Sequence, residues 1–509
     1  MSLFSNLFNF SLADAASPAP RTLLVGVART VRQLHRVVRE ANTPLEIVGC
    51  ALLQPQHRAG AVGLQVLGTV DQLDMLAKLH RVDRVLVSVP AAMNAAVDEV
   101  RRRCRDLSVQ CHEVPPIDEL IEGSAAASGR APRGSIDVEA LLDRPPRRLD
   151  EAAIGRLLKA KRVLVTGAGG SIGSELARII ARYAPAELLL MERAENNLFQ
   201  VLHELRAAAP EVSTRGLLHD VARDDRTLAL CRQHRPQIVF HAAAHKHVPM
   251  MEDHPREAVE NNFFGTRAIA DAAHDVDAER FVMISTDKAV NPTSVMGATK
   301  RLAERYVQHL NGLSDTAYTM VRFGNVLGST ASVVPIWSAQ LAEGRPLTVT
   351  DPRMTRYFMT IPEAAALVIQ AAALDDAGGQ VMVLDMGRPI RIVDLAHRFI
   401  KLQGLEPERD VPIVFTGVRP GEKLFEELAY DSEAMAPTRH ESVHIHLTRP
   451  PGNEEMARLV HRFDRLRHSD ERPLILDALH DAVPEMRASA ATSTAELPPA
   501  PSQGAKETA

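Results

Sequence analysis

Three adjacent residues, Thr286, Asp287 and Lys288, place a hydroxyl, a carboxylate and an amine directly after a run of apolar residues. The run 281–285 reads as a buried strand, so the polar residues follow its carboxyl end, the edge at which open α/β sheets bind ligands. In a water-poor cleft, a neighbouring carboxylate and ammonium shift each other's pKa, which suits general acid–base chemistry. Outside such a context the same pair reads as an ordinary surface ion pair.

Two more candidates lie on the helix expected after this strand. Met296 and Lys300 are four residues apart, which places them one turn apart on one helical face. A thioether does not accept a proton at neutral pH, so Met296 taken alone suggests an inactive enzyme or a core residue.

A glycine-rich turn is the strongest local signal for a cofactor. In KRVLVTGAGGSIGSELARII a β-branched run ends in glycines just as a helix opens. Such glycines permit a tight turn, the approach of a pyrophosphate and close packing of helix on strand, while the helix N-terminus faces the phosphates. The motif predicts a dinucleotide site at Gly167, Gly170, Ser171, Ile172 and Gly173.

The following strands complete the predicted cofactor site. The strand ELLLM ends at Glu192, about twenty residues beyond the glycines, where an acid binds a ribose hydroxyl. Glu192 favours NAD because its charge repels a 2′-phosphate, whereas Arg193 beside it leaves NADP open. The positions expected near the adenine, and the small residues that leave room for the cofactor, are Asp220, Val221, Ala242 and Ala243.

Alternating strands and helices must position these residues, and most of the chain reads that way. Residues 160–487 predict a doubly wound Rossmann domain with a smaller substrate-binding part, mainly 325–450. Residues 21–115 contain four earlier strands, RTLLVGV, EIVGCALL, DRVLVSVP and VQCHEV. The first turn of this unit keeps only Gly26 where a dinucleotide turn needs three glycines. We therefore expect an α/β chain in which a Rossmann-like module and its linker, 21–150, precede the main domain.

Seven stretches between about residues 160 and 430 resemble the CapD-type polysaccharide-biosynthesis family of UDP-N-acetylglucosamine 4,6-dehydratases, within the extended short-chain dehydrogenases/reductases. The wider superfamily has a tyrosine where Met296 stands. A subset of the dehydratases shows the same methionine, so Met296 marks a subtype and leaves the base for the sugar 4-hydroxyl open. The stretches are VLVTGAGGSIGSEL, HAAAHKHVPMME, STDKAVNPTSVMGATK, VRFGNVLGS, TRYFMTIPEA, VLDMG and TGVRPGEKLFEEL.

The resemblance implies an NAD-dependent dehydration of a UDP-N-acetylhexosamine, expected to be UDP-N-acetylglucosamine, for surface polysaccharide or glycan synthesis. Thr286 would hydrogen-bond the 4-hydroxyl while carbon 4 is oxidised, and Lys300 would hold the nicotinamide ribose. Lys288 would then remove the proton on carbon 5, and Asp287 would protonate the departing 6-hydroxyl before the hydride returns to carbon 6. This scheme requires both charged side chains to face the nicotinamide cavity.

The substrate is expected to meet a further set of polar residues. Arginine forks suit a diphosphate and a carboxylate suits a ribose diol, although Arg356 fits a structural salt bridge equally well. Lys246, just beyond a strand end, lies within reach of either the cofactor or the sugar. The predicted substrate-binding residues are Lys246, Asn325, Arg356, Arg419 and Glu422.

Two alternative functions stay open. A nucleotide-sugar 4-epimerase shares the fold, the cofactor and the first step, but it needs the tyrosine and has no need of an Asp–Lys pair. A non-catalytic NAD-binding scaffold is favoured by Met296 and by the degenerate turn at Gly26, and is opposed by the intact run Thr286 to Lys288.

The composition limits which binding partners and which cellular compartment we expect for this protein. The 509 residues are 45% hydrophobic and 24% charged with a net charge of −5, so no basic face for nucleic acid is expected. The spacing of the four cysteines predicts no metal site and favours a cytoplasmic protein. No stretch approaches the length of a membrane-spanning helix, and the short apolar start (Phe4, Leu7, Phe8, Leu12) leaves peripheral contact with the inner membrane open. Residues 1–20 and 488–509 are expected to be flexible, and the resemblance implies a homo-oligomer.

Overall fold

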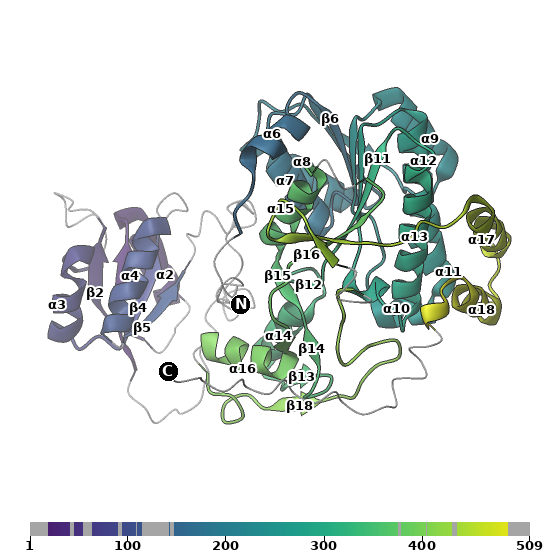
Figure 1. Cartoon of the computed structure of the whole chain (residues 1–509). Coiled ribbons are helices and arrows are strands. Elements are labelled where there is room, and N and C mark those ends of the chain that lie inside the picture. Colours follow the sequence, from purple (N-terminus) through teal and green to yellow (C-terminus); the bar gives the residue numbers. More distant parts are fainter. Residues whose placement is uncertain are drawn as a thin grey trace, which may run out of the picture. The chain divides into compact units, whose positions relative to one another are not determined.

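The computed structural model describes residues 19–40, 45–53, 64–89, 94–107, 109–114, 142, 147–374, 378–403, 405–429 and 435–486. The chain divides into two units, residues 1–135 and 136–509 (Figure 1). The predicted flexible ends, apart from Ala19 and Pro20, and the apolar residues near the N-terminus lie outside the described residues.

The first unit holds a five-stranded parallel sheet in the order β3–β2–β1–β4–β5. The edge strand β3 was not predicted, because four residues that include a glycine carry little alternation. A Cβ at Gly26 would lie 2.0 Å from the carbonyl oxygen of Ser88, so close packing explains this glycine. The elements are β1 (Arg21–Gly26), α2 (Ala28–Glu40), β2 (Glu46–Leu52), β3 (Val66–Thr69), α3 (Leu73–Leu79), β4 (Arg84–Ser88), α4 (Asn94–Asp106) and β5 (Gln110–Glu113).

The second unit is built on a nine-stranded sheet in the order β19–β20–β16–β11–β10–β9–β6–β7–β8. Its seven strands from β16 to β8 are parallel, and β20 and β19 extend it in antiparallel fashion. Because β6 lies between β7 and β9, the strand order reverses there, which is where open α/β sheets bind ligands. The strands are β6 (Arg162–Thr166), β7 (Glu187–Glu192), β8 (Thr214–Leu218), β9 (Ile238–His241), β10 (Arg280–Ile284), β11 (Ala317–Arg322), β16 (Val381–Leu384), β19 (Met435–Pro437) and β20 (Val443–His446).

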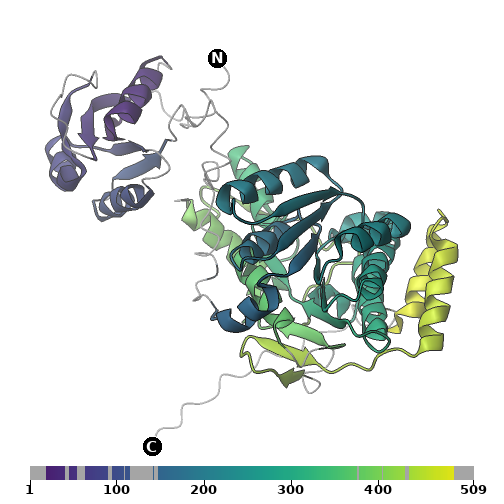
Figure 2. The same ribbon diagram turned by 90° about the horizontal axis from the view of Figure 1, so that it is seen from above.

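Helices cover both faces of this sheet. Alternate residues of β6 belong to different cores: Val163 and Val165 pack on one face and Leu164 on the other. The first face is covered by α6 (Glu151–Leu158), α7 (Ser171–Ala181), α8 (Glu195–Ala208) and α15 (Ile361–Ala372). The second is covered by α9 (Asp224–His234), α12 (Gly265–Asp275) and α13 (Val295–Asn311), and the hairpin of α17 (Asn453–Leu466) and α18 (Arg472–Ala482) packs outside α13 (Figures 1 and 2).

The second unit begins earlier than the sequence indicated. The sequence predicts a linker up to residue 150 and a main domain from about residue 160, but α6 belongs to the second unit and buries Ile154 and Leu158 against the core that contains α15. The side chain of Asp150 caps α6 by accepting a hydrogen bond from the amide of Ala153 at 2.9 Å. The helix is only eight residues long, so its periodicity was too brief to predict.

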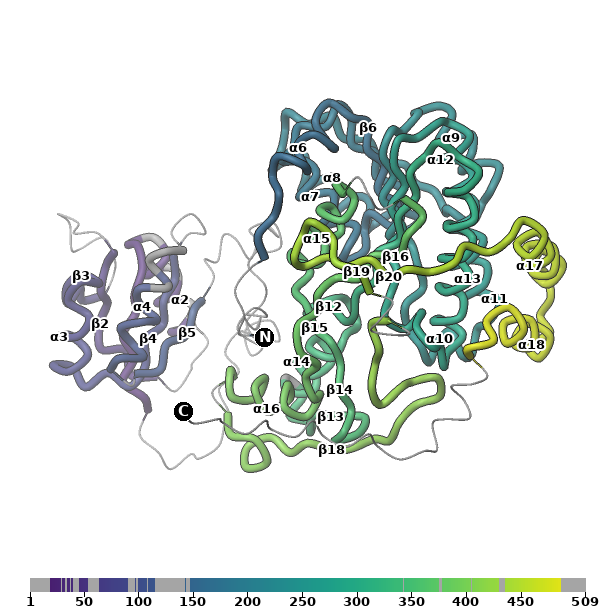
Figure 3. The backbone as a smooth tube through the Cα atoms, viewed as in Figure 1, coloured from purple at the N-terminus to yellow at the C-terminus, as the bar shows by residue number. Residues whose placement is uncertain are grey.

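A smaller lobe contains three two-stranded sheets and two helices. Its core includes Trp337 and Phe399, whose ring centroids are 5.5 Å apart. Figure 3 traces the backbone beyond β18, where residues 416–429 carry two of the predicted substrate residues, Arg419 and Glu422. None of the helices in the described ranges combines the length and apolar character needed to cross a bilayer. The elements are β12 (Asn325–Leu327) with β15 (Phe358–Thr360), β13 (Leu347–Val349) with β18 (Ile413–Phe415), β14 (Thr355–Arg356) with β17 (Ile390–Arg391), α14 (Val333–Ala342) and α16 (Ile392–Leu402).

Candidate active site

The turn after β6 has the geometry expected of its glycines. Gly167 has a φ of +62°, and a Cβ there would lie 2.7 Å from the backbone of Ala243. A Cβ on Gly173 would lie 2.1 Å from the carbonyl oxygen of Gly167, so α7 approaches β6 this closely only with glycine. The first residues of α7, from Ser171 to Gly173, line a cavity of about 720 Å³ together with the glycines before them. The amide-rich helix N-terminus therefore faces the cavity, as a pyrophosphate site requires.

The acid at the end of β7 lies beside this turn. The carboxylate of Glu192 accepts hydrogen bonds from the amides of Gly169 at 3.1 Å and Ala194 at 3.0 Å. Arg193 and Asp220, 3.8 Å apart, share a separate surface hollow at the ends of β7 and β8. Of the other predicted cofactor positions, Val221 is buried and Ala242 lines the main cavity.

The run Thr286 to Lys288 lies beyond the carboxyl end of β10, as predicted. The Thr286 hydroxyl donates a hydrogen bond to Oδ1 of Asp287 at 2.9 Å, and Nζ of Lys288 donates to the same oxygen at 3.0 Å. Thr286 and Lys288 line the cavity, whereas Asp287 is fully buried and does not line it. The expectation that both charged side chains face the cavity therefore holds only for Lys288. Asp287 begins the short 3-10 turn η5 (Asp287–Ala289), which directs its carboxylate inward.

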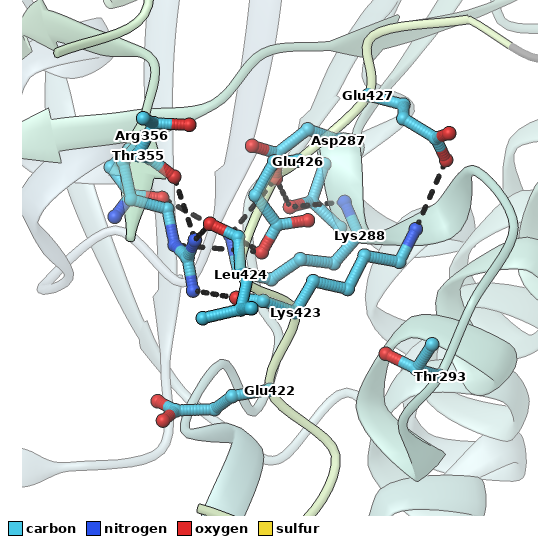
Figure 4. A network of polar contacts seen from close by, with 12 residues as sticks. Asp287, Lys288, Thr293, Thr355, Arg356, Glu422, Lys423, Leu424, Glu426 and Glu427 are labelled. Carbon is cyan, nitrogen blue, oxygen red and sulfur yellow. Dashed lines mark hydrogen bonds and ion pairs between the residues drawn. The ribbon is translucent and has the colours of Figure 1, made fainter. Parts of the chain in front are cut away.

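A second buried carboxylate, which the sequence analysis missed, faces Lys288. Oε1 of Glu426 lies 3.5 Å from Nζ of Lys288 and 3.6 Å from Nε of Arg356. Figure 4 shows Glu426 among Lys288, Asp287 and Arg356. Nζ of Lys288 also donates to Oδ1 of Asn325 at 3.1 Å. Burial lowers the pKa of Lys288, but the charges of Asp287 and Glu426 outweigh it and raise the pKa above its usual value. The resting lysine is therefore an ammonium ion.

Arg356 holds the segment that carries Glu426. Its guanidinium donates to the carbonyl oxygens of Thr355 at 2.7 Å, Lys423 at 2.8 Å and Leu424 at 3.2 Å. These contacts leave few N–H donors of the guanidinium for a diphosphate, so they favour a structural role for Arg356 over the predicted phosphate contact.

Arg419 and Glu422, both predicted to contact the substrate, form an ion pair with each other. The guanidinium of Arg419 donates to the two carboxylate oxygens of Glu422 at 2.6 and 3.1 Å, and both residues line the main cavity. Figure 4 shows the Glu422 carboxylate apart from the cluster around Lys288. TGVRPGEKLFEEL contains three glutamates, and only the fold distinguishes the buried Glu426 among them.

The α13 residues also line the cavity. Met296 is 4% exposed, and Nζ of Lys300 donates to the carbonyl oxygen of Ile284 at 2.7 Å. Burial lowers the pKa of Lys300 to about 8, against the opposing charge of Glu304. The side chain predicted to hold a ribose therefore lies at the cavity wall, next to the methionine.

A buried ion pair anchors α13 to the sheet. Glu304, one turn beyond Lys300, accepts hydrogen bonds from Nε and Nη2 of Arg322 at 2.7 and 2.6 Å, and both side chains are fully buried. The Ser285 hydroxyl donates to the same carboxylate at 2.7 Å. Burial by itself raises the pKa of Glu304, but Arg322, Arg301 and Ser285 together lower it to about 2.

Lys246 connects the cavity to the loop after β12. Its amine donates to the carbonyl oxygen of Thr330 at 3.0 Å and to the hydroxyl of Ser329 at 3.3 Å. The amide of Thr330 in turn donates to the hydroxyl of Ser171 at 3.3 Å. Lys246 thus lies where the loop meets the glycine turn, and burial lowers its pKa.

The parallel sheet, the glycine turn and the cavity at the sheet's carboxyl edge define a Rossmann fold of the dinucleotide-binding type. Residues 163–448 match the family described as polysaccharide biosynthesis protein, and the chain belongs to that family. The predicted resemblance to CapD-type proteins is thereby confirmed.

Named relatives agree with this assignment. The probable polysaccharide biosynthesis protein EpsC of Bacillus subtilis is 39% identical over 482 residues, 94% of this chain and 80% of that protein. The capsular polysaccharide biosynthesis protein CapD of Staphylococcus aureus is 43% identical over 75% of this chain and 63% of its own length. A UDP-N-acetylglucosamine 4,6-dehydratase (inverting) of Campylobacter jejuni is 31% identical over 53% of this chain and 78% of that enzyme. Among solved structures, Pen of Bacillus thuringiensis is 33% identical with a TM-score of 0.53, over 58% of this chain and 89% of that one.

Proposed function

We propose that this chain is a nucleotide-sugar 4,6-dehydratase that acts on a UDP-N-acetylhexosamine, with UDP-N-acetylglucosamine as the expected substrate. The observation that carries the proposal is the cavity shared by the glycine turn, Thr286, Lys288 and Lys300. The name of the Campylobacter relative supports this reaction and substrate, and the names of EpsC and CapD support a role in polysaccharide synthesis.

The described residues fit NAD. The amides of the turn from Gly170 to Gly173 would hold the pyrophosphate, Glu192 would accept a ribose hydroxyl, and Lys300 would hold the nicotinamide ribose. The carboxylate of Glu192 favours NAD over NADP because its negative charge repels a 2′-phosphate. Bound NAD would supply the hydride chemistry, as the acceptor for the hydride of carbon 4 and the donor to carbon 6.

Thr286 provides a route for the proton of the 4-hydroxyl, for which Met296 offers no base. The threonine lines the cavity, and its hydroxyl donates a hydrogen bond to Oδ1 of Asp287 at 2.9 Å. A proton leaving the 4-hydroxyl therefore passes to the oxygen of Thr286 while the threonine proton moves to Asp287. The buried carboxylate becomes neutral, and the sugar gains its 4-ketone.

Lys288 is the group that meets carbon 5. The 4-ketone acidifies the proton there, and the amine of Lys288 lies on the cavity wall with Asn325 and two carboxylates around it. Removal of that proton and departure of the 6-hydroxyl as water complete the elimination. Arg419 and Glu422, on the same cavity wall, are the proposed contacts for the UDP part.

Mass spectrometry of the product tests the proposal. Purified protein with NAD and UDP-N-acetylglucosamine should yield a sugar nucleotide lighter by one water, with deuterium at carbon 5 when the reaction runs in heavy water. Asp287→Asn and Lys288→Ala should each abolish water loss and leave NAD binding within about threefold of the unmodified protein. An unchanged mass with an inverted 4-hydroxyl would instead indicate an epimerase, and no reaction would indicate a scaffold.

A further inference from the structure

We propose that Glu426 is a further acid–base residue, which takes a proton from Lys288 and delivers it to the departing 6-hydroxyl. This inference rests on the proposed dehydratase function and transfers to Glu426 the acid role predicted for Asp287. It follows from the positions of the two carboxylates around one amine.

Only one of these carboxylates lies on the cavity wall. Asp287 is fully buried, and its Oδ1 already accepts hydrogen bonds from Thr286 and Lys288. The side chain of Glu426 is 2% exposed yet lines the cavity. Oε2 of Glu426 and Oδ2 of Asp287 are both buried and have no hydrogen-bond partner among the described residues, but only Glu426 lines the cavity, so its free oxygen is the one available to a hydroxyl group bound there.

The second carboxylate also solves a protonation problem at Lys288. A base must be neutral to take the proton from carbon 5, but the charges of Asp287 and Glu426 keep the resting Lys288 an ammonium ion, and Glu426 still pairs with it after Asp287 has taken the 4-hydroxyl proton. Oε1 of Glu426 lies 3.5 Å from Nζ, close enough for a proton to cross with a small movement of either side chain. Burial penalises the two charges, so the relief of that penalty in the neutral amine and carboxyl group offsets part of the attraction that the ion pair loses.

Arg356 keeps Glu426 in place for this exchange. Its guanidinium binds the backbone carbonyls of residues 423 and 424, just before Glu426, and its Nε lies 3.6 Å from the carboxylate (Figure 4). Because Arg356 has these carbonyl partners of its own, its N–H donors stay hydrogen-bonded when Glu426 is neutralised.

Protons balance over the whole reaction. The Nζ–H bond of Lys288 breaks as an O–H bond forms on Glu426, and the free amine then takes the proton from carbon 5. The enolate of the 4-ketone expels the 6-hydroxyl, which takes the proton of Glu426 and leaves as water. Once the hydride is on carbon 6, Lys288 returns its proton to carbon 5. Asp287 then gives Lys288 the proton it received through Thr286, which restores the starting state.

Glu426→Gln is the decisive variant, because it preserves shape but cannot accept or deliver this proton. In the unmodified protein the exchange is internal, so deuterium uptake at carbon 5 and water loss should be flat with pH between about 6 and 8. In Glu426→Gln, Lys288 must lose its proton to solvent. The rate should fall about 100-fold or more at pH 7 and rise about tenfold per pH unit towards the pKa of Lys288. Formation of reduced nicotinamide should persist, since Thr286 and Asp287 are unchanged.

Glu427→Gln is the matched control. Glu427 is the next residue, half exposed and paired with Lys423 and Asn291, so its substitution should leave rate and pH profile unchanged. Glu426→Asp keeps a carboxyl group and should keep a flat profile at reduced rate, which provides a test if the glutamine variant does not fold.

Other results would overturn the inference. If Glu426 acted through its charge alone, its neutralisation would lower the pKa of Lys288 and leave Glu426→Gln as fast or faster. An equal loss of rate at every pH would show a structural role only. If the unmodified protein loses no water from the sugar nucleotide, the proposed function itself fails; if it does and Glu426→Gln keeps a flat profile, only the role of Glu426 fails.

Discussion

Replacing Glu304 by glutamine should destabilise the second unit more than any surface substitution. The change removes one negative charge from a carboxylate that accepts hydrogen bonds from Ser285 and twice from Arg322. The new amide group presents N–H donors to arginine donors. Arg322 is then a fully buried cation without its counter-charge.

Two independent routes give the magnitude. Breaking a buried ion pair by removing one partner costs about 3–5 kcal/mol. The pKa of Glu304, lowered from 4.5 to about 2 in the folded protein, corresponds to about 3 kcal/mol. Because the folded pKa is the lower one, this stabilisation is complete above pH 4.5 and is lost as the pH falls through about 2. We therefore expect Glu304→Gln to lower the free energy of unfolding by about 3 kcal/mol at pH 7.

Urea unfolding followed by tryptophan fluorescence measures this quantity. The chain has a single tryptophan, Trp337, buried in the second unit, so its emission reports on that unit alone. Glu304→Met combined with Arg322→Met, which removes both charges, should cost less than the single change. A loss below about 1 kcal/mol for Glu304→Gln would place the pair in the range of solvated ion pairs and refute the reasoning.

Three further predictions concern the cofactor and the C-terminal hairpin. Gly173→Ala places a Cβ 2.1 Å from the Gly167 carbonyl and should weaken NAD binding about tenfold or more by calorimetry; an unchanged dissociation constant would contradict the close approach of α7 to β6. The affinity for NAD should fall as the pH rises through about 8, because Lys300 then loses its charge. The Lys300→Met variant should bind NAD weakly at every pH. If both proteins show the same dependence of NAD affinity on pH, Lys300 does not contact the cofactor. Arg467→Ala removes ion pairs to Glu260 and Asp224 and a cation–π contact with Phe264 at 4.6 Å, and should cost about 2 kcal/mol and expose α17–α18 to limited proteolysis. Protease resistance equal to that of the unmodified chain would show that apolar packing alone holds the hairpin.

Much of the site could be predicted because it depends on local conformation. The turn of Gly167 and Gly173 needs a positive φ and a missing Cβ, and both requirements are visible in the residue types themselves. A strand that ends at Ile284 places the next residues at the carboxyl edge of a parallel sheet whatever lies around them. For the same reason the class of fold and the family were apparent from short stretches in order.

Tertiary structure alone decided which of these side chains reach the cavity. Asp287 and Lys288 are neighbours, yet the turn after β10 buries the carboxylate and leaves only the amine on the wall. Glu426 is one of three glutamates in its segment, and it becomes buried against Lys288 because Arg356 holds the backbone before it. Periodicity and turn chemistry describe a residue's own backbone. Burial and charge pairing depend on which distant segments of the chain pack against a residue, and a local sequence pattern does not show which segments these are.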